Sequence, residues 1–248
     1  MFGLRLRLPV TEEERQWVDE GFRRLHRMVG WSRTQNGPVV LPTDEFFPDP
    51  WEASEAGVEA IFQRVCGYMK VPRHEVELTL IPDDSDLLDM LPAYHHASDD
   101  PAGLHFGSDG DEQPLIAVRR WLLKDPLLLV ATLAHELGHV ILLEGGRLER
   151  EAGDMEPLTD LATVYLGMGV FTANAARRFR QYQEDTWQGW SMERLGYLSE
   201  TVYGYALARF ARNRGESRPA WTGYLSTNVK TWFRQSAAWL ERETRPIA

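Results

Sequence analysis

The chain has 248 residues, of which 43% are hydrophobic, so it can bury the core of one large domain or of two small ones. Its formal net charge of −10 argues against nucleic acid or an anionic membrane as a partner. The single cysteine, Cys66, excludes an intrachain disulfide and is typical of a reducing compartment.

The first stretch of the chain alternates apolar and charged residues. Residues 2–8 predict a half-exposed strand, and the arginines inside this apolar stretch are unlike a signal peptide, so we expect a cytoplasmic protein. A capping box then predicts a helix that begins after Thr11. After a proline-rich loop, the pair Asp49-Pro50 predicts the start of a second helix, which runs to about Lys70.

Three more strands are predicted before the middle of the chain. Alternation predicts a strand at 76–81, and short apolar runs next to turn signals predict strands at 104–107 and 115–119. With residues 2–8 they would form a small mixed sheet. The acidic stretch 82–101 lacks the fixed spacing of an EF-hand, so a solvated loop is favoured over a calcium site. Three histidines in or next to this loop could border an active site, although surface or strand roles are favoured: His95, His96 and His105.

A run of almost wholly apolar residues follows, from 125 to 145. Asp125 is a suitable N-cap and Pro126 suits the first helical position, so the run predicts a helix. At about nineteen residues, the run is long enough to span a membrane. The polar insert His-Glu-Leu-Gly-His within it instead favours the buried central helix of a soluble domain.

The polar insert carries two histidines at metal-binding spacing. His135 and His139 are four residues apart, so they share one face of the helix and their imidazoles can bind one zinc ion. Glu136 points roughly 100° further around the helix, where it can reach a water on that zinc and act as general base. Two histidines and a glutamate are costly in an apolar helix unless they are coordinated or paired. This His-Glu-x-x-His pattern therefore predicts a zinc site with a catalytic carboxylate.

The motif and the residues after it resemble the gluzincins, the thermolysin-like group of the zincin metallopeptidases. In that family a second helix carries Glu-x-x-x-Asp, and this chain has Glu156-Pro-Leu-Thr-Asp160. The resemblance implies that Glu156 is the third zinc ligand and that Asp160 hydrogen-bonds a zinc-bound histidine. It covers only about residues 125–171, and its motifs are more specific for a zinc site than for a substrate.

The identity of the third ligand depends on one feature of the spacing. Sixteen residues separate His139 from Glu156, somewhat fewer than in thermolysin-like enzymes, so the chain must reverse tightly between 145 and 155. If it does not, Asp160 becomes the ligand and Glu156 caps the helix. Glu156 is favoured, because a carboxylate that orients a ligand imidazole, as Asp160 would, is common at such sites. A third alternative is that both acidic residues only stabilise the start of a helix.

The C-terminal third of the chain predicts helices and no strand. The helix that carries Glu156 is expected to continue to Phe171, with a basic helix through residues 177–180 after it. Ser191 is the expected cap of a long helix that ends near Arg212. One or two helices rich in aromatic residues complete the chain.

The sequence therefore predicts an α+β protein with a zincin-like core in a single domain. Residues 1–124 would supply helices and the sheet, and residues 125–248 a mainly helical part with the zinc motif. We expect a peptide or protein substrate, with Glu136 as general base. Most aromatic residues of the C-terminal third are expected in the core, and among them Tyr203 or Tyr205 is the candidate donor to the oxyanion. Two other functions stay open: a zinc-binding regulatory protein without turnover, and a metal-assisted hydrolase of a non-peptide amide. The presence of Glu136 argues against the first.

Overall fold

The computed structural model describes residues 7–83, 103–106, 113–143, 146–149, 152–184 and 198–243. Within them the chain is mainly helical and has one small sheet, so the α+β prediction is confirmed. The α-helices and β-strands are, in chain order, α1 (Glu12–Val29), α2 (Trp31–Asn36), α3 (Glu55–Met69), β1 (Glu77–Ile81), β2 (Gly103–Phe106), β3 (Leu115–Arg119), α5 (Pro126–Leu143), α6 (Met155–Tyr165), α7 (Gly169–Glu184), α8 (Glu200–Asn213) and α9 (Thr227–Glu243).

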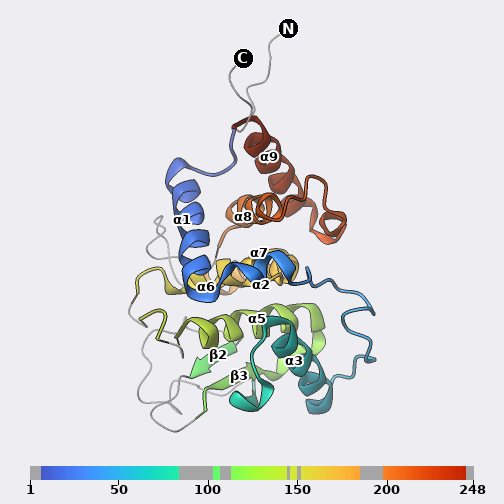
Figure 1. The fold of residues 1–248 in the computed structure, drawn as a ribbon. Coiled ribbons are helices and arrows are strands. Elements are labelled where there is room, and N and C mark those ends of the chain that lie inside the picture. The colour runs from blue at the N-terminus through green and yellow to red at the C-terminus, as the bar shows by residue number, and fades with distance from the viewer. Residues whose placement is uncertain are drawn as a thin grey trace.

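Helix α5 lies across the middle of the molecule, between two groups of elements (Figure 1). On one side it contacts α3, β2 and β3, and on the other side it contacts α6 and α7. Helices α8 and α9 pack against each other beyond α6 and α7, and α1 contacts both α6 and α8. Because α5 is enclosed in this way, every residue from 128 to 142 is buried.

The apolar helix α5 is the buried central helix that its sequence predicts. By length and composition alone, Pro126–Leu143 could cross a membrane, but 83% of it is buried inside the protein. The carboxylate of Asp125 accepts a hydrogen bond from the Leu128 amide (3.1 Å), as an N-cap does. Burying one leucine side chain stabilises a fold by about 1.5–3 kcal/mol, so packing rather than helix propensity holds α5 in place.

The sheet is small and mixed, as predicted. Its order is β1-β3-β2, with β1 parallel and β2 antiparallel to the central strand β3. The strands predicted at 76–81, 104–107 and 115–119 correspond to these three within one residue at each end. The strand predicted at 2–8 falls mostly outside the described residues, and the two of its residues that are described are not in a strand.

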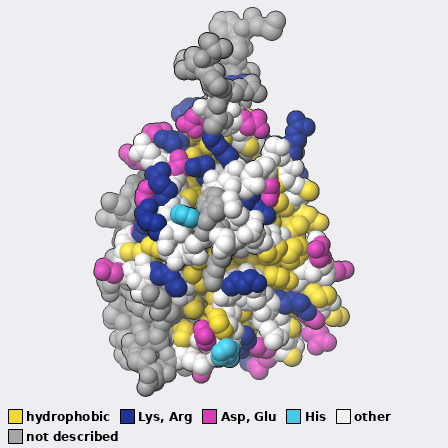
Figure 2. All heavy atoms as spheres, viewed as in Figure 1, with side chains coloured by type: hydrophobic (Ala, Val, Ile, Leu, Met, Phe, Trp, Pro, Cys, Tyr) yellow, Lys and Arg dark blue, Asp and Glu magenta, His cyan; other side chains and the backbone are white. Residues whose placement is uncertain are grey.

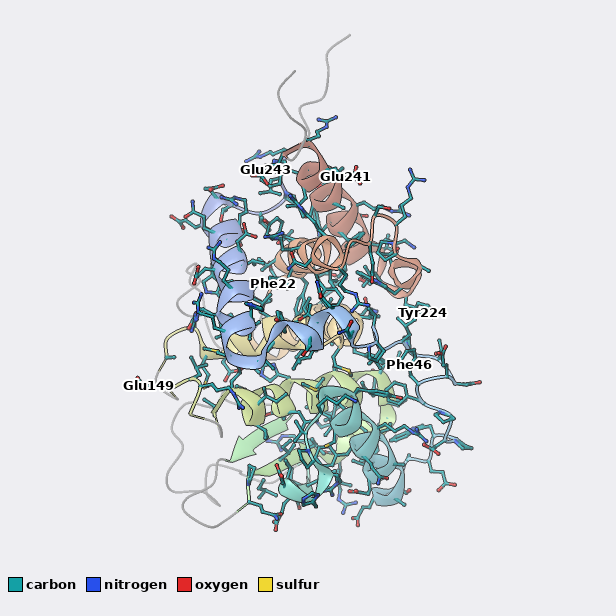
Figure 3. All side chains as sticks on the ribbon, in the orientation of Figure 1. Phe22, Phe46, Glu149, Tyr224, Glu241 and Glu243 are labelled. Atoms are coloured by element: carbon teal, nitrogen blue, oxygen red, sulfur yellow. The ribbon has the colours of Figure 1, made fainter. Side chains whose placement is uncertain are left out.

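Helix α1 is anchored to α6 by apolar contacts. Phe22 points from α1 into the interior (Figure 3), and its ring lies 5.9 Å from that of Tyr165 on α6. Gly21 lies so close to the same helix that a Cβ atom placed on it would be 2.4 Å from Cδ2 of Leu161. The capping box predicted for the start of α1 is also present, with Thr11 accepting from the Glu14 amide.

The surface carries charged side chains of both signs. On the face shown in Figure 2, lysine and arginine side chains are interspersed with aspartate and glutamate. Several of them form exposed ion pairs, such as those of Glu20 with Arg23 and Arg27. Exposed pairs of this kind contribute about 0–1 kcal/mol each, so the fold depends little on them.

The predicted start of the second helix is wrong. Helix α3 begins at Glu55, and its N-cap is Ser54, whose hydroxyl accepts a hydrogen bond from the Gly57 amide (3.2 Å). Asp49 instead forms an ion pair with Arg64, which lies on α3 itself. The carboxylate is thus used by an ion pair and not by a cap. In addition, the predicted loop before α3 contains the short helix α2.

The helix predicted from Glu156 to Phe171 is in fact two helices. Helix α6 ends at Tyr165, and α7 begins at Gly169. Between them Gly167 has φ +87°, a left-handed conformation that side chains other than hydrogen disfavour. A Cβ atom on Gly167 would lie 2.3 Å from the carbonyl oxygen of Pro38, so the loop before α3 packs directly against this break.

The remaining C-terminal prediction is partly outside the described residues. Ser191 is not among them, and α8 begins after Ser199, whose hydroxyl accepts from the Val202 amide (3.3 Å). The end of α8 at Asn213 agrees with the predicted end near Arg212. The final aromatic-rich segment forms α9.

The break at Gly167 can be tested with a matched glycine. Gly215 also has a positive φ (+73°), but no atom of the described residues lies within 4 Å of the position of its missing Cβ. Gly215→Ala should therefore lose only the backbone preference, about 1–2 kcal/mol. Gly167→Ala should lose that amount and also displace the Pro38 carbonyl. We expect Gly167→Ala to melt at a clearly lower temperature than Gly215→Ala. In a protein of this size, a loss of about 1 kcal/mol in the free energy of unfolding lowers the melting temperature by about 2–4 °C. Equal melting temperatures of the two variants would contradict the close contact between Gly167 and the Pro38 carbonyl.

Candidate metal centre

The candidate centre lies where α5 and α6 contact each other. His135 and His139, four residues apart on α5, form one side of this interface. Glu156, Thr159 and Asp160 form the other side, because positions i, i+3 and i+4 of α6 share one helix face. The two short motifs therefore become one site through the pairing of two helices.

Three side-chain atoms form a compact triangle, which we call the donor triangle. It consists of Nε2 of His135, Nε2 of His139 and Oε2 of Glu156. The two nitrogens are 3.1 Å apart, and the carboxylate oxygen lies 3.0 Å from the first and 3.3 Å from the second. Atoms at corners of a tetrahedron, each about 2.0–2.1 Å from its centre, are about 3.3–3.4 Å apart. The donor triangle therefore has a size at which these residues could hold a metal ion.

Asp160 occupies the other side of the His135 ring. One carboxylate oxygen lies 2.8 Å from Nδ1 of His135, and the other accepts a hydrogen bond from the Leu198 amide (2.8 Å). The residue is only 1% exposed. Both of its oxygens are therefore already engaged away from Nε2, and Glu156 is the carboxylate that the structure brings to the donor triangle.

The tight reversal between the two helices is present in the fold. Gly146, with φ +61°, donates from its amide to the Leu143 carbonyl (2.9 Å) just after α5. The Arg147 guanidinium donates to the carbonyl of Ile141 (2.7 Å) and so covers an open carbonyl near the end of that helix. At the other end of the turn, Asp154 is held by Arg24 and by the indole of Trp17 (3.2 Å). These contacts, made largely outside the motif, let the short connection place α6 beside α5.

Glu136 lies beside the donor triangle and not within it. It is 4% exposed, and burial raises the pKa of its carboxyl, while the neighbouring His135 and His139 oppose this shift. No residue that the structure describes hydrogen-bonds to this carboxyl. Helical geometry directs Glu136 roughly 100° around α5 from His135.

The charged groups of the donor triangle perturb one another strongly. Burial alone would raise the pKa of Glu156, but the two histidines outweigh burial and lower it. Burial likewise opposes a charge on His135, yet its hydrogen bonds to Asp160 and Glu156 raise its pKa well above the usual value. The site therefore favours positive charge between its carboxylates, and a cation satisfies the same preference.

The two tyrosines predicted as oxyanion donors both lie on α8 and are buried. The hydroxyl of Tyr205 donates to Asp19 on α1 (3.1 Å), and Asp19 is also paired with Arg209. The hydroxyl of Tyr205 is thus already used in the contact between α1 and α8. A role for Tyr203 in binding the oxyanion stays a prediction.

Sequence reasoning gave no role to two residues that contact the site. Thr159 lies 3.3 Å from Nδ1 of His139, and Gly138 lies against Thr159 so closely that a Cβ on it would be 2.8 Å from the threonine methyl. The signal for Thr159 was available, because it is three residues after Glu156 and thus on the same face of α6. The sequence around Gly138 does not show why a glycine is needed, because the side chain that it contacts, Thr159, lies on another helix.

Comparison with known proteins adds no relative. No family model matches the chain, and no curated protein and no solved structure matches it. The resemblance to gluzincins therefore rests on the sequence motifs alone.

The first prediction about the site concerns its metal content. Purified protein should carry about one zinc per chain, and His135→Ala and His139→Ala should each lose it, because each removes one of three ligands. His26→Ala, which changes an exposed histidine of α1, is the matched control and should keep the metal. Metal analysis of the four proteins measures this, and full occupancy in both site variants would refute the site.

A second prediction separates the two carboxylates of α6. Glu156→Ala should weaken zinc binding more than Asp160→Ala, since removing a group that only orients a ligand costs about 10–100-fold in affinity. Zinc titration in competition with a chelator measures both losses. The reverse order of the two affinities would make Asp160 the ligand and would contradict the donor triangle.

Proposed function

We propose that this protein is a zinc-dependent peptidase. The observation that carries the proposal is the donor triangle of His135, His139 and Glu156 with the buried carboxyl of Glu136 beside it. Two imidazoles and one carboxylate are a ligand set typical of catalytic zinc, in which the fourth position stays open.

Zinc is the metal we propose because of the kind of ligand. Imidazole nitrogen suits zinc, copper, iron and nickel, whereas calcium and magnesium prefer sites made of oxygen ligands. With only one carboxylate among its three donors, the donor triangle is a poor match for calcium or magnesium. Zinc commonly binds such donors in tetrahedral geometry, and it takes no part in redox chemistry.

The chain's own residues would then divide the chemistry between them. Zinc bound in the triangle would lower the pKa of a bound water to about 7. Glu136 would accept a proton as that water attacks a carbonyl, and would pass the proton to the leaving nitrogen. Its burial supports this role, because burial raises the pKa of the carboxyl and so makes it a stronger base than an exposed glutamate.

An extended peptide is the substrate that the fold supports best. Strand β2 lies at the edge of the sheet as described, is antiparallel to β3, and contacts α5, the helix that carries the motif. The edge of a sheet presents backbone groups that can pair with an added strand. In the gluzincins an edge strand next to the motif helix binds substrate in this way, so the same arrangement is proposed here.

The enzymatic role can be separated from a purely structural metal site by Glu136→Gln. Glu136 has no place in the donor triangle, so this variant should keep its zinc and its fold. It should lose the general base, a contribution of about 10²–10⁴-fold in rate. The measurement is the digestion of a broad peptide library by wild type, by the variant and by chelator-treated protein, with zinc content determined in parallel.

The outcomes of this digestion discriminate between the candidate functions. Cleavage by wild type alone supports the peptidase. Equal cleavage by wild type and Glu136→Gln would contradict the role of Glu136. Zinc in both proteins, with no cleavage of peptides but chelator-sensitive hydrolysis of simple amides by wild type, would favour the non-peptide amide hydrolase.

A further inference from the structure

Each histidine of the donor triangle has its second ring nitrogen next to a polar side chain of α6. Nδ1 of His135 lies 2.8 Å from Asp160, and Nδ1 of His139 lies 3.3 Å from the hydroxyl of Thr159. A neutral imidazole carries one proton, so it can bind a metal through Nε2 only if the proton is on Nδ1. The group beside Nδ1 therefore decides whether the histidine is ready to bind.

The hydroxyl of Thr159 can act toward His139 only as an acceptor. A hydroxyl has one proton, and that of Thr159 is donated to the Met155 carbonyl (2.9 Å), one turn earlier on α6. A lone pair remains on the hydroxyl oxygen, which lies 3.3 Å from Nδ1 of His139 and can accept an N–H from it. We propose that Thr159 is a positioning residue, which holds His139 in the tautomer whose Nε2 lone pair faces the donor triangle. The proposal rests on the proposed function and adds to it a residue outside the Glu-x-x-x-Asp pattern.

The opposite tautomer of His139 would lose its contact with Thr159 and also the Nε2 lone pair that can bind a metal. Its Nδ1 lone pair would face the lone pair of Thr159, and its Nε2 proton would point toward Nε2 of His135 and Oε2 of Glu156, at 3.1 and 3.3 Å. That proton would occupy the position where a metal ion must bind. Thr159 thus opposes the one neutral form of His139 that cannot serve as a ligand through Nε2.

Gly138 makes the contact possible. A Cβ on this residue would lie 2.8 Å from the methyl carbon of Thr159 and 3.4 Å from its carbonyl oxygen, so the side chain of any other residue would push α6 away. Gly138 directly precedes His139 in the chain, and Thr159 is completely buried. The close approach of the two helices therefore places the hydroxyl next to the histidine.

A role in packing alone would give the opposite pattern in two conservative variants. Thr159→Val keeps the branched shape and removes the hydroxyl, whereas Thr159→Ser keeps the hydroxyl and removes the methyl that contacts Gly138. If Thr159 only fills space, the serine variant is the more damaged one. If Thr159 positions His139, the valine variant loses metal affinity and the serine variant restores it.

Thr163 offers a matched control on the same helix. It is also completely buried, and its hydroxyl donates to the Asp160 carbonyl (2.7 Å) and contacts Thr172 (2.8 Å), with no described bond to either histidine of the triangle. Thr163→Val therefore removes a buried hydroxyl from α6 without removing the proposed contact.

The experiment measures zinc affinity by chelator competition and the melting temperature of the metal-free protein for wild type and for the three variants. Thr159→Val should bind zinc about tenfold more weakly, at the lower end of the 10–100-fold range for groups that orient a ligand, because 3.3 Å is long for a hydrogen bond. Thr159→Ser and Thr163→Val should bind zinc nearly as well as wild type, whatever their melting temperatures.

Each other outcome overturns the proposal. Wild-type affinity in Thr159→Val would mean that the hydroxyl does not position His139, while the metal centre itself would stand. Equal losses in Thr159→Val and Thr159→Ser, or in Thr159→Val and Thr163→Val, would show a general effect of packing. Wild-type protein that binds no zinc would refute the proposed function, and this proposal with it.

Discussion

The contact between α5 and α6 is the constraint on which the candidate centre depends. Two imidazoles and two carboxylates lie in or beside this interface, and leaving such groups buried without partners costs several kcal/mol each. Their partners lie on the opposite helix, because the histidines are on α5 and the carboxylates on α6. A shift by one helical turn, about 5.4 Å, would break all of these pairs together. Polar pairing therefore determines the register of the two helices, which apolar packing alone would specify less sharply.

The surrounding elements hold α6 in that register. Helix α1 contacts it through Gly21 and Phe22 and through the pairing of Arg24 with Asp154 at its start. The segment before α8 holds it from another direction, since the Leu198 amide donates to Asp160. Helix α5 contacts α6 and α7 on one side and is held on its other side by α3 and the sheet. The two halves of the donor triangle thus belong to two different packing groups, which meet at the site, and neither group could form the site alone.

Features that depend on local spacing could be predicted from the sequence, and features caused by distant contacts could not. Helix α5 and its two histidines follow from periodicity, caps and motif spacing, whereas Glu156 was suggested by the resemblance to gluzincins. The break at Gly167 does not, because its cause is the Pro38 carbonyl in a loop far earlier in the chain. The start of α3 was misplaced for a related reason: Asp49 has the chemistry of a cap, but an ion pair with Arg64 uses its carboxylate. Thr159 lies between these cases, since its face could be predicted and the direction of its hydroxyl could not.

The presence of a glutamate at position 136 is not explained by the stability of the fold. Its side chain is 4% exposed in the most apolar of the described helices, and no described protein group hydrogen-bonds to its carboxyl. Such burial costs free energy, and an apolar residue at the same place would be more stable. A site that only bound metal for stability would gain nothing from this carboxyl, because His135, His139 and Glu156 already offer three candidate ligand atoms. Local rules of stability are broken in this way mostly at functional sites. The energetic cost of Glu136 therefore supports a centre that performs chemistry over one that only holds an ion.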